Sequence, residues 1–231
     1  MIGDPPVVTL RRGFTRPNAA QLAAFAGVPT GFMVDAQNGR GAVDYRIKPL
    51  WPEVSFAAPA VTVDCGPRDN LSLFIAIEVA QPGDVIMLAT GAYEGTSVLG
   101  DHVAAMAKNK GVVAIVTDGL VRDVEGLIQV GLPVYCRGVS PNSPYKSGPC
   151  EVGTSITLGG VTVASGDLVV GDRGGAAGGP RQGAGDGRRD RGRPHHARLG
   201  PRAAPVLAHA AARLSEFGSH RAGPVLRSRH G

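Results

Sequence analysis

Between residues 57 and 137, the apolar positions fall into short runs rich in Val and Ile, separated by segments of helical length. The runs favour buried strands, because β-branched side chains fit a pleated surface. Strands are predicted at 57–65, 85–89, 112–117 and 133–137. Helices are predicted at 71–80, 100–110 and 121–130, the last two each followed by a glycine. Strands that alternate with helices of this length indicate an α/β layer.

The segments on either side of this layer carry different patterns. Residues 16–26 are rich in Ala and predict a helix, and a second short helix is expected near 31–37. From Ile156 the sequence reads ITLGGVTVASGDLVVGD, in which short apolar runs are joined by glycine turns. This pattern predicts short strands in a β layer that packs against the first layer.

The composition changes abruptly at Gly174. Residues 174–231 contain 12 Gly and 11 Arg among 58 residues, and their first half has no hydrophobic periodicity. Such a segment cannot bury enough apolar surface to offset the entropy lost on ordering. We therefore divide the chain into a folded domain, 1–173, and an atypical low-complexity tail, 174–231, which we expect to be disordered.

The net charge of +5 also comes from this tail. The tail has 11 Arg, no Lys and 3 acidic residues, a balance of +8, which leaves −3 for residues 1–173. RNA binding by the tail is therefore one hypothesis, but we expect no nucleic-acid partner for the folded domain.

The remaining bulk features narrow the class of protein. The three cysteines are far apart and odd in number, which favours free thiols in a reducing compartment. The first residues do not resemble a signal peptide, and no apolar stretch approaches the roughly 20 residues of a membrane helix. We expect a cytoplasmic protein with no membrane partner. The sequence also lacks the phosphate-binding GxxxxGK[ST] and nucleophile GxSxG motifs.

Candidate chemistry centres on Asp101 and the pair Arg122-Asp123, which are separated from each other by residues 102–121. We expect each group in the first turn of a helix. If neighbouring parallel strands lead into both helices, the two starts face one crevice at the carboxyl ends of the strands. Free amides at Gly100–Val103 and the guanidinium of Arg122 would bind a carboxylate.

The same residues suit metal chemistry. Asp123 offers a hard oxygen ligand for Mg²⁺ or Mn²⁺, with water in the other positions. A 2-keto acid could chelate this ion, which would act as a Lewis acid on the enolate, while Asp101 could hold a water that transfers a proton.

The same residues also have simpler explanations. Acidic residues in a first helical turn favour the helix dipole, and an Arg-Asp pair is often a surface salt bridge worth less than ~1 kcal/mol. His102 is as consistent with a surface position as with a ligand contact, and Lys146 could approach the site from its loop. His195-His196 lack metal-ligand spacing and fit a solvated tail.

The pattern D-x20-R-D, with its flanks LGDHVAAMAKNKGVVAIVTDGLVRD, resembles the metal-dependent aldolases that act on 4-hydroxy-4-methyl-2-oxoglutarate and 4-carboxy-4-hydroxy-2-oxoadipate. The same fold family contains the regulator of ribonuclease E activity. The similarity covers about residues 57–173, including the stretches APAVTV, PGDVIML, PVYCRGVSP and GGVTVASGDLVVGD.

The resemblance implies roles for individual residues. Gly100, Asp101, His102 and Val103 match the substrate-binding stretch, Arg122 the arginine that binds the keto-acid carboxylate, and Asp123 the metal ligand. It implies a layered α/β/β sandwich of the swivelling-domain type, assembled as trimers or pairs of trimers with sites at subunit interfaces. The implied activity is a class II pyruvate aldolase, a carbon–carbon lyase with Asp101 and Arg122 as catalytic residues and oxaloacetate decarboxylation as a second reaction. The alternative is a non-catalytic regulator that binds other proteins.

The chain departs from the family after GDLVVGDR. The family continues with Asp-Gly, a valine run and a C-terminal helix, and a neighbouring subunit supplies an acidic site residue from this region. Here the sequence becomes GGAAGGPR, and Glu216 is the only Glu of the tail. In a GC-rich gene a shifted frame would convert Val codons to Gly, Ala, Arg and Pro. A frameshift near codon 174 is therefore one hypothesis, which resequencing the gene would test; a genuine basic extension is the other.

Overall fold

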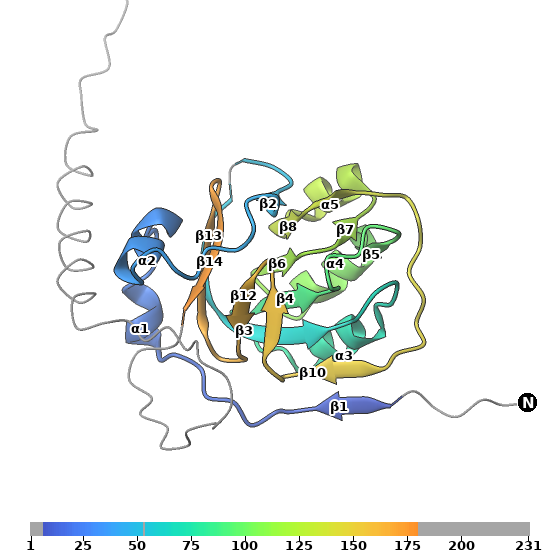
Figure 1. The fold of residues 1–231 in the computed structure, drawn as a ribbon, viewed down its shortest axis with the longest axis horizontal. Coiled ribbons are helices and arrows are strands. Elements are labelled where there is room, and N and C mark those ends of the chain that lie inside the picture. Colours follow the sequence, from blue (N-terminus) through green and yellow to red (C-terminus); the bar gives the residue numbers. More distant parts are fainter. Residues whose placement is uncertain (1–6, 53, 180–231) are drawn as a thin grey trace, which may run out of the picture.

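A parallel sheet forms the centre of the protein. The computed structural model describes residues 7–52 and 54–179. Its central strands are β3 (Phe56–Asp64), β4 (Val85–Ala89), β6 (Ala114–Thr117) and β8 (Val134–Cys136). They are mutually parallel and adjacent in this order, which confirms the four predicted strands. Figure 1 shows how the rest of the chain is arranged around them.

Shorter strands extend this sheet at both edges. They are β1 (Val8–Leu10), β2 (Lys48–Pro49), β10 (Cys150–Val152), β13 (Leu168–Asp172) and β14 (Gly175–Gly179). β2 pairs with β8 at one edge, and β10 and β13 both run antiparallel to the long strand β3 at the other. β1 then pairs with β10, and β14 with β13.

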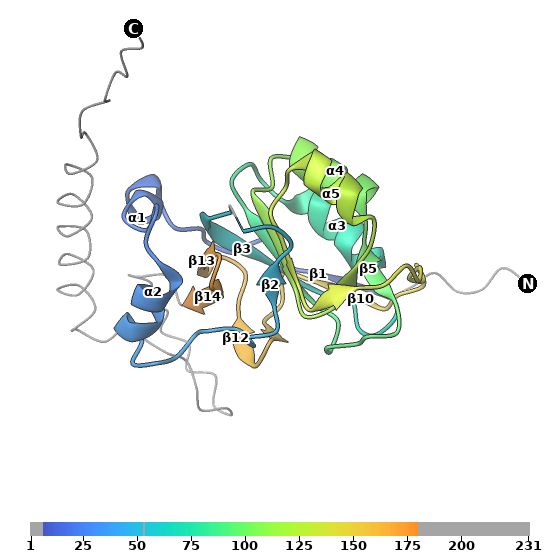
Figure 2. The same cartoon turned by 90° about the horizontal axis from the view of Figure 1, so that it is seen from above.

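Three helices cover one face of the sheet, as Figure 2 shows from above. They are α3 (Leu71–Val79), α4 (Asp101–Asn109) and α5 (Val124–Val130). Because side chains alternate across a strand, Leu88 of β4 and Ile115 of β6 meet these helices in one buried cluster. No helix in the described parts of the chain is long and apolar enough to cross a membrane.

The opposite face is covered by β structure. The hairpin of β11 (Ile156–Leu158) and β12 (Val161–Val163) packs on Met87, Val116 and Tyr135, the side chains that point away from the helices. Two small helices, α1 (Ala19–Ala23) and α2 (Thr30–Ala36), lie beyond this region, and α2 contacts β13 and β14. The result is the expected mixed α/β fold, with helices on one face and hairpins on the other.

A second, small parallel sheet extends the carboxyl ends of the central strands. It consists of β5 (Ser97–Leu99), β7 (Leu120–Val121) and β9 (Gly138–Val139), in the order β5-β7-β9. The three strands follow β4, β6 and β8 along the chain. They were not predicted, and the helix expected from residue 121 starts instead at Val124. Strands of two or three residues are too short to produce a periodic signal.

The fold continues beyond residue 173, where the sequence predicted the tail to begin. Gly175–Gly179 form β14, which is paired with β13 along its whole length and is buried. Backbone hydrogen bonds need no side chains, and small residues allow α2 to lie close. A Cβ on Gly179 would approach within 2.8 Å of Met33 Cε. The predicted division at 173 therefore falls inside a hairpin; residues 180–231, on which the disorder prediction depends, lie outside the described residues.

Candidate functional site

The two groups of candidate residues lie side by side at the end of the small sheet. β5 and β7 are parallel neighbours, and the Arg122 amide donates to the Leu99 carbonyl at 3.0 Å. Gly100-Asp101 and Arg122-Asp123 directly follow these two strands. The prediction that neighbouring parallel strands lead into both helix starts is therefore confirmed, although the strands belong to the small sheet and not to the main one.

Asp123 occupies a special backbone position. It precedes α5 in the left-handed conformation, with φ 57° and ψ 51°, and its side chain does not cap the helix. Aspartate tolerates this conformation better than most residues, but at a cost of order 1 kcal/mol. Its carboxylate lies over Gly100, where an added Cβ would be 2.4 Å from Oδ2. A helix-capping role does not explain this residue, because a capping carboxylate would bond to the first amides of α5.

Arg122 lies between β7 and α5, so the expected position in the first helical turn is wrong. Its Nε is 3.2 Å from Asp123 Oδ2, and Nη1 donates to the hydroxyl of Ser143 at 2.7 Å. Nη2 has no hydrogen-bond partner within residues 7–52 and 54–179. The side chains of Arg122 and Asp123 are 38% and 46% exposed, so an anion or a cation could reach both.

Asp101 is the first residue of α4, as predicted. Its Oδ1 accepts from the His102 amide and contacts His102 Nδ1, each at 2.7 Å. The hydrogen bonds from His102, first from the ring and then from the amide, lower the pKa of Asp101, and the charge of Arg122 acts in the same direction. The carboxylate rests on Gly126 of α5, where an added Cβ would be 2.6 Å from Oδ2. Glycine at both 100 and 126 therefore makes room for the two carboxylates.

The predicted carboxylate-binding stretch, Gly100–Val103, differs from expectation in two details. The His102 amide is not free, because Asp101 already accepts from it. The ring of His102 is 96% exposed, and the Val103 side chain packs against the core, so neither side chain encloses a ligand. Gly126 and Ser143 were not predicted as site residues, although a glycine within a helix usually has a packing or functional reason.

The oxygen ligands at the site decide whether it suits a divalent cation. The described residues contain no group of three or more His, Cys, Asp or Glu that could hold a metal. Asp123 offers a partly exposed carboxylate that lies directly over Gly100. A single carboxylate completed by water and substrate oxygens matches Mg²⁺, which retains several waters in proteins. The residues therefore fit an ion that is bound together with a substrate.

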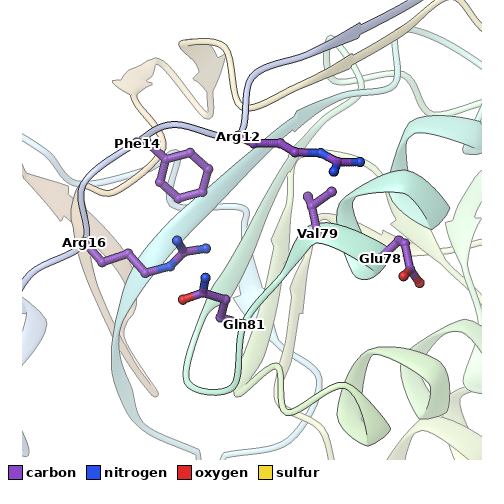
Figure 3. A pocket seen from close by; sticks show the side chains of 6 residues that line it. All are labelled: Arg12, Phe14, Arg16, Glu78, Val79 and Gln81. Atoms are coloured by element: carbon purple, nitrogen blue, oxygen red, sulfur yellow. The ribbon is translucent and has the colours of Figure 1, made fainter.

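Other candidate features of the protein do not add to this site. A pocket of about 250 Å³ near the amino ends of the strands is lined by Arg12, Phe14, Arg16, Glu78, Val79 and Gln81 (Figure 3). Two nitrogens of its Arg16 are engaged by Asp84, with Nε and Nη2 each 2.7 Å from a carboxylate oxygen. Lys146 does not join the candidate site, since its ammonium lies over the Phe74 ring of α3. His195, His196 and Glu216 lie outside the described residues.

The cysteines do not form a second reactive centre. Cys65, Cys136 and Cys150 are buried and free, as expected. Burial raises the pKa of Cys136 to about 11 and that of Cys65 further, so neither thiol is an activated nucleophile at neutral pH.

Comparison with known proteins identifies the family. Residues 30–177 match the RraA-like family, described as Aldolase/RraA. The chain belongs to this family. The matched range includes every residue of the candidate site and extends through most of β14.

Two relatives of this Aldolase/RraA chain carry names that point to different functions. A Halalkalibacterium halodurans protein named "Putative 4-hydroxy-4-methyl-2-oxoglutarate aldolase" is 34% identical over 151 residues, covering 65% of this chain and 72% of the relative. The RNA-processing inhibitor RraA from Thermus thermophilus superposes with a TM-score of 0.62 at 26% identity, covering 69% of this chain and 96% of that one.

A third relative bears on the fold alone. Streptomyces coelicolor RraAS2, described as an unusual member of the RNase ES inhibitor RraA family, superposes with a TM-score of 0.69 at 24% identity. The match covers 90% of this chain and all of that one.

Proposed function

We propose that this protein is a divalent-metal-dependent lyase that cleaves 4-hydroxy-4-methyl-2-oxoglutarate and related 2-keto acids to release pyruvate, and that it also decarboxylates oxaloacetate. The observation that carries the proposal is the exposed Arg122-Asp123 pair, in which Asp123 has an unfavourable left-handed backbone although its side chain does not cap α5. Membership of the Aldolase/RraA family and the name of the 34% identical relative support the same reaction.

Each residue has a distinct role in this proposal. Arg122 binds the carboxylate of the 2-keto acid, because Nη2 is free to donate and the charge is permanent. Asp123 would hold Mg²⁺ or Mn²⁺ near Gly100, and such an ion would supply Lewis-acid chemistry to a keto group. Gly100 contributes the absence of a side chain, which leaves room for the Asp123 carboxylate.

Asp101 is the proposed proton-handling residue. Cleavage removes a proton from the 4-hydroxyl group, breaks the C3–C4 bond and delivers a proton to C3 of the pyruvate fragment. Because its pKa is lowered, Asp101 stays ionised and acts as an acceptor that orients a water molecule for these transfers.

We further propose that the active form is a homotrimer or a pair of trimers in the cytoplasm. Arg122 and Asp123 are substantially exposed in the single chain, which supports a site that a second copy would close. Exclusion of water would strengthen the electrostatic interactions of both residues with a substrate.

A non-catalytic regulator is the second candidate, and the Thermus RNA-processing inhibitor supports it. The two functions make opposite predictions for Asp123→Ala. A regulator would retain its protein partner in a pull-down from the native host, whereas the lyase would lose pyruvate formation.

The decisive assay measures pyruvate release from 4-hydroxy-4-methyl-2-oxoglutarate, with and without Mg²⁺ or Mn²⁺. The lyase predicts release that depends on the metal and disappears after chelation. No release from folded, metal-loaded protein of established oligomeric state would refute the proposal.

A further inference from the structure

Ser143 lies in the loop after β9 and contacts the candidate site from outside the two helix starts. Its hydroxyl accepts from Arg122 Nη1 at 2.7 Å, while Nε of the same guanidinium faces Asp123 at 3.2 Å. The guanidinium is therefore held at two of its three nitrogens. We infer that Ser143 is a positioning residue that fixes the orientation in which Arg122 presents its free N–H groups to a substrate carboxylate.

The loop that carries Ser143 is itself fixed. The Ser140 amide donates to the Val121 carbonyl of β7, and the Asn142 carbonyl accepts from both the amide and the hydroxyl of Ser97 in β5. Beyond Ser143, the Tyr145 amide donates to the Arg68 carbonyl, in the loop before α3, at 2.7 Å. These hydrogen bonds attach the chain to β7 and β5 before Ser143, and to the loop before α3 after it.

A fixed hydrogen-bond acceptor matters because an arginine side chain otherwise adopts many conformations. Its side chain has roughly 2 kcal/mol of rotamer entropy to lose, and 38% of the Arg122 side chain is exposed. Orienting the guanidinium before the substrate arrives removes part of this cost from binding. In this orientation, Nη2 and the second hydrogen of Nη1 remain available to donate hydrogen bonds to a bound anion.

The inference also concerns the substrate. A serine hydroxyl that accepts from Arg122 retains its own hydrogen, which can be donated to an oxygen of the same anion. Arg122 and Ser143 together offer three or more donors to one planar carboxylate, the group common to 2-keto acids. This part of the inference rests on the proposed function.

The test compares Ser143→Ala with Ser143→Thr and with the matched control Ser147→Ala. Ser147 belongs to the same loop, and its hydroxyl has no hydrogen-bond partner in the described part of the chain. In metal-loaded protein, Ser143→Ala should raise the pyruvate Kd and the substrate KM by about three- to tenfold, the range for one ordinary hydrogen bond. The kcat should change less, and the Mn²⁺ Kd and the melting temperature should not change.

Two control variants separate loss of the Ser143 hydroxyl from a general effect of changing this loop. Ser143→Thr retains a hydroxyl and should restore tight pyruvate binding, whereas Ser147→Ala should match the wild type. An unchanged pyruvate Kd in Ser143→Ala, or an equal loss in Ser147→Ala, would overturn the inference.

A second readout does not depend on turnover. NMR signals of the Arg122 guanidinium should show hindered rotation and slow proton exchange in the wild type, and faster exchange in Ser143→Ala. Equal exchange in the two proteins would refute the positioning role, even in a protein without lyase activity. Absence of pyruvate release with this NMR difference present would instead refute the proposed function and leave the positioning role standing.

Discussion

Two Arg-Asp pairs in this protein use the same chemical groups in opposite ways. Arg16 and Asp84 form a two-pronged contact at 2.7 Å, and Asp84 Oδ2 also accepts from the Gln81 amide. The Asp84 side chain is 1% exposed. Arg122 and Asp123 share one contact at 3.2 Å and are 38% and 46% exposed, and Asp123 has a left-handed backbone.

The difference separates a structural pair from a functional one. The carboxylate of Asp84 is occupied and links the N-terminal segment to the start of β4. The second pair keeps donor and acceptor capacity unused, at a conformational cost that packing does not explain. Unused polar capacity on a strained backbone is typical of functional sites. Variants of the two pairs should therefore affect different properties of the protein.

The largest effect on stability is expected from Asp84→Ala. The substitution leaves the Arg16 guanidinium largely buried and without its carboxylate. Removing one partner of a buried pair costs about 3–5 kcal/mol, which denaturant unfolding would measure. Glu78→Ala is the control, because Glu78 is 82% exposed and 3.6 Å from Lys110, and it should hardly change the unfolding midpoint. Equal effects of the two variants would contradict the structural role of Asp84.

The next largest effect is expected from Arg122→Ala, and on activity instead of stability. Loss of the carboxylate anchor should lower kcat/KM about a hundredfold, since a charged hydrogen-bonding group is removed from the substrate. The unfolding midpoint should stay close to that of the wild type, because the pair is exposed. Retained activity, or a stability loss like that of Asp84→Ala, would remove the contrast between the pairs.

Gly100→Ala should have a smaller effect on the same site. Its new methyl group would be 2.4 Å from Asp123 Oδ2, so the carboxylate must move. We expect about a tenfold loss in kcat/KM and in Mn²⁺ affinity, with a helix-start penalty of up to ~1 kcal/mol. Gly13→Ala provides the control, because an added Cβ there meets nothing within 4 Å. Full metal affinity in Gly100→Ala would argue against ion binding over Gly100.

The smallest effect is expected from His102→Ala. Loss of the ring hydrogen bond should raise the pKa of Asp101 toward the ordinary aspartate range, as an NMR pH titration of its carboxyl carbon would measure. In the wild type, any stability that the lowered pKa contributes is present above the ordinary aspartate range and is lost as the pH falls through that range to the lowered pKa. In the variant this pH-dependent loss should be smaller. An unchanged titration would show that the ring does not influence Asp101.

The sequence predicted the architecture well where elements are long. The parallel strands from β3 to β8 carry continuous apolar runs, and α3 and α4 match their predicted ranges to within a residue or two. It failed at the small sheet, where β5 and β7 have only three and two residues and depend on neighbours distant in the chain. It also failed at β14, where Gly and Ala pair through the backbone alone.

The candidate site shows the same division. The motif predicted that Asp101 and Arg122-Asp123 would come together. It could not predict the left-handed backbone of Asp123, which follows from how β7 passes into α5. Ser143 was also missed, because its contact with Arg122 joins residues that are 21 positions apart without any periodic relation.

The measurement that tests the central claim most directly is metal-dependent pyruvate release from 4-hydroxy-4-methyl-2-oxoglutarate by the wild type and by Asp123→Ala. The wild type should release pyruvate with Mg²⁺ or Mn²⁺ and stop when the metal is chelated. Asp123→Ala should lose this activity and its Mn²⁺ affinity while unfolding at the same denaturant concentration. Equal, metal-independent rates in the two proteins, or no pyruvate from either, would contradict the account.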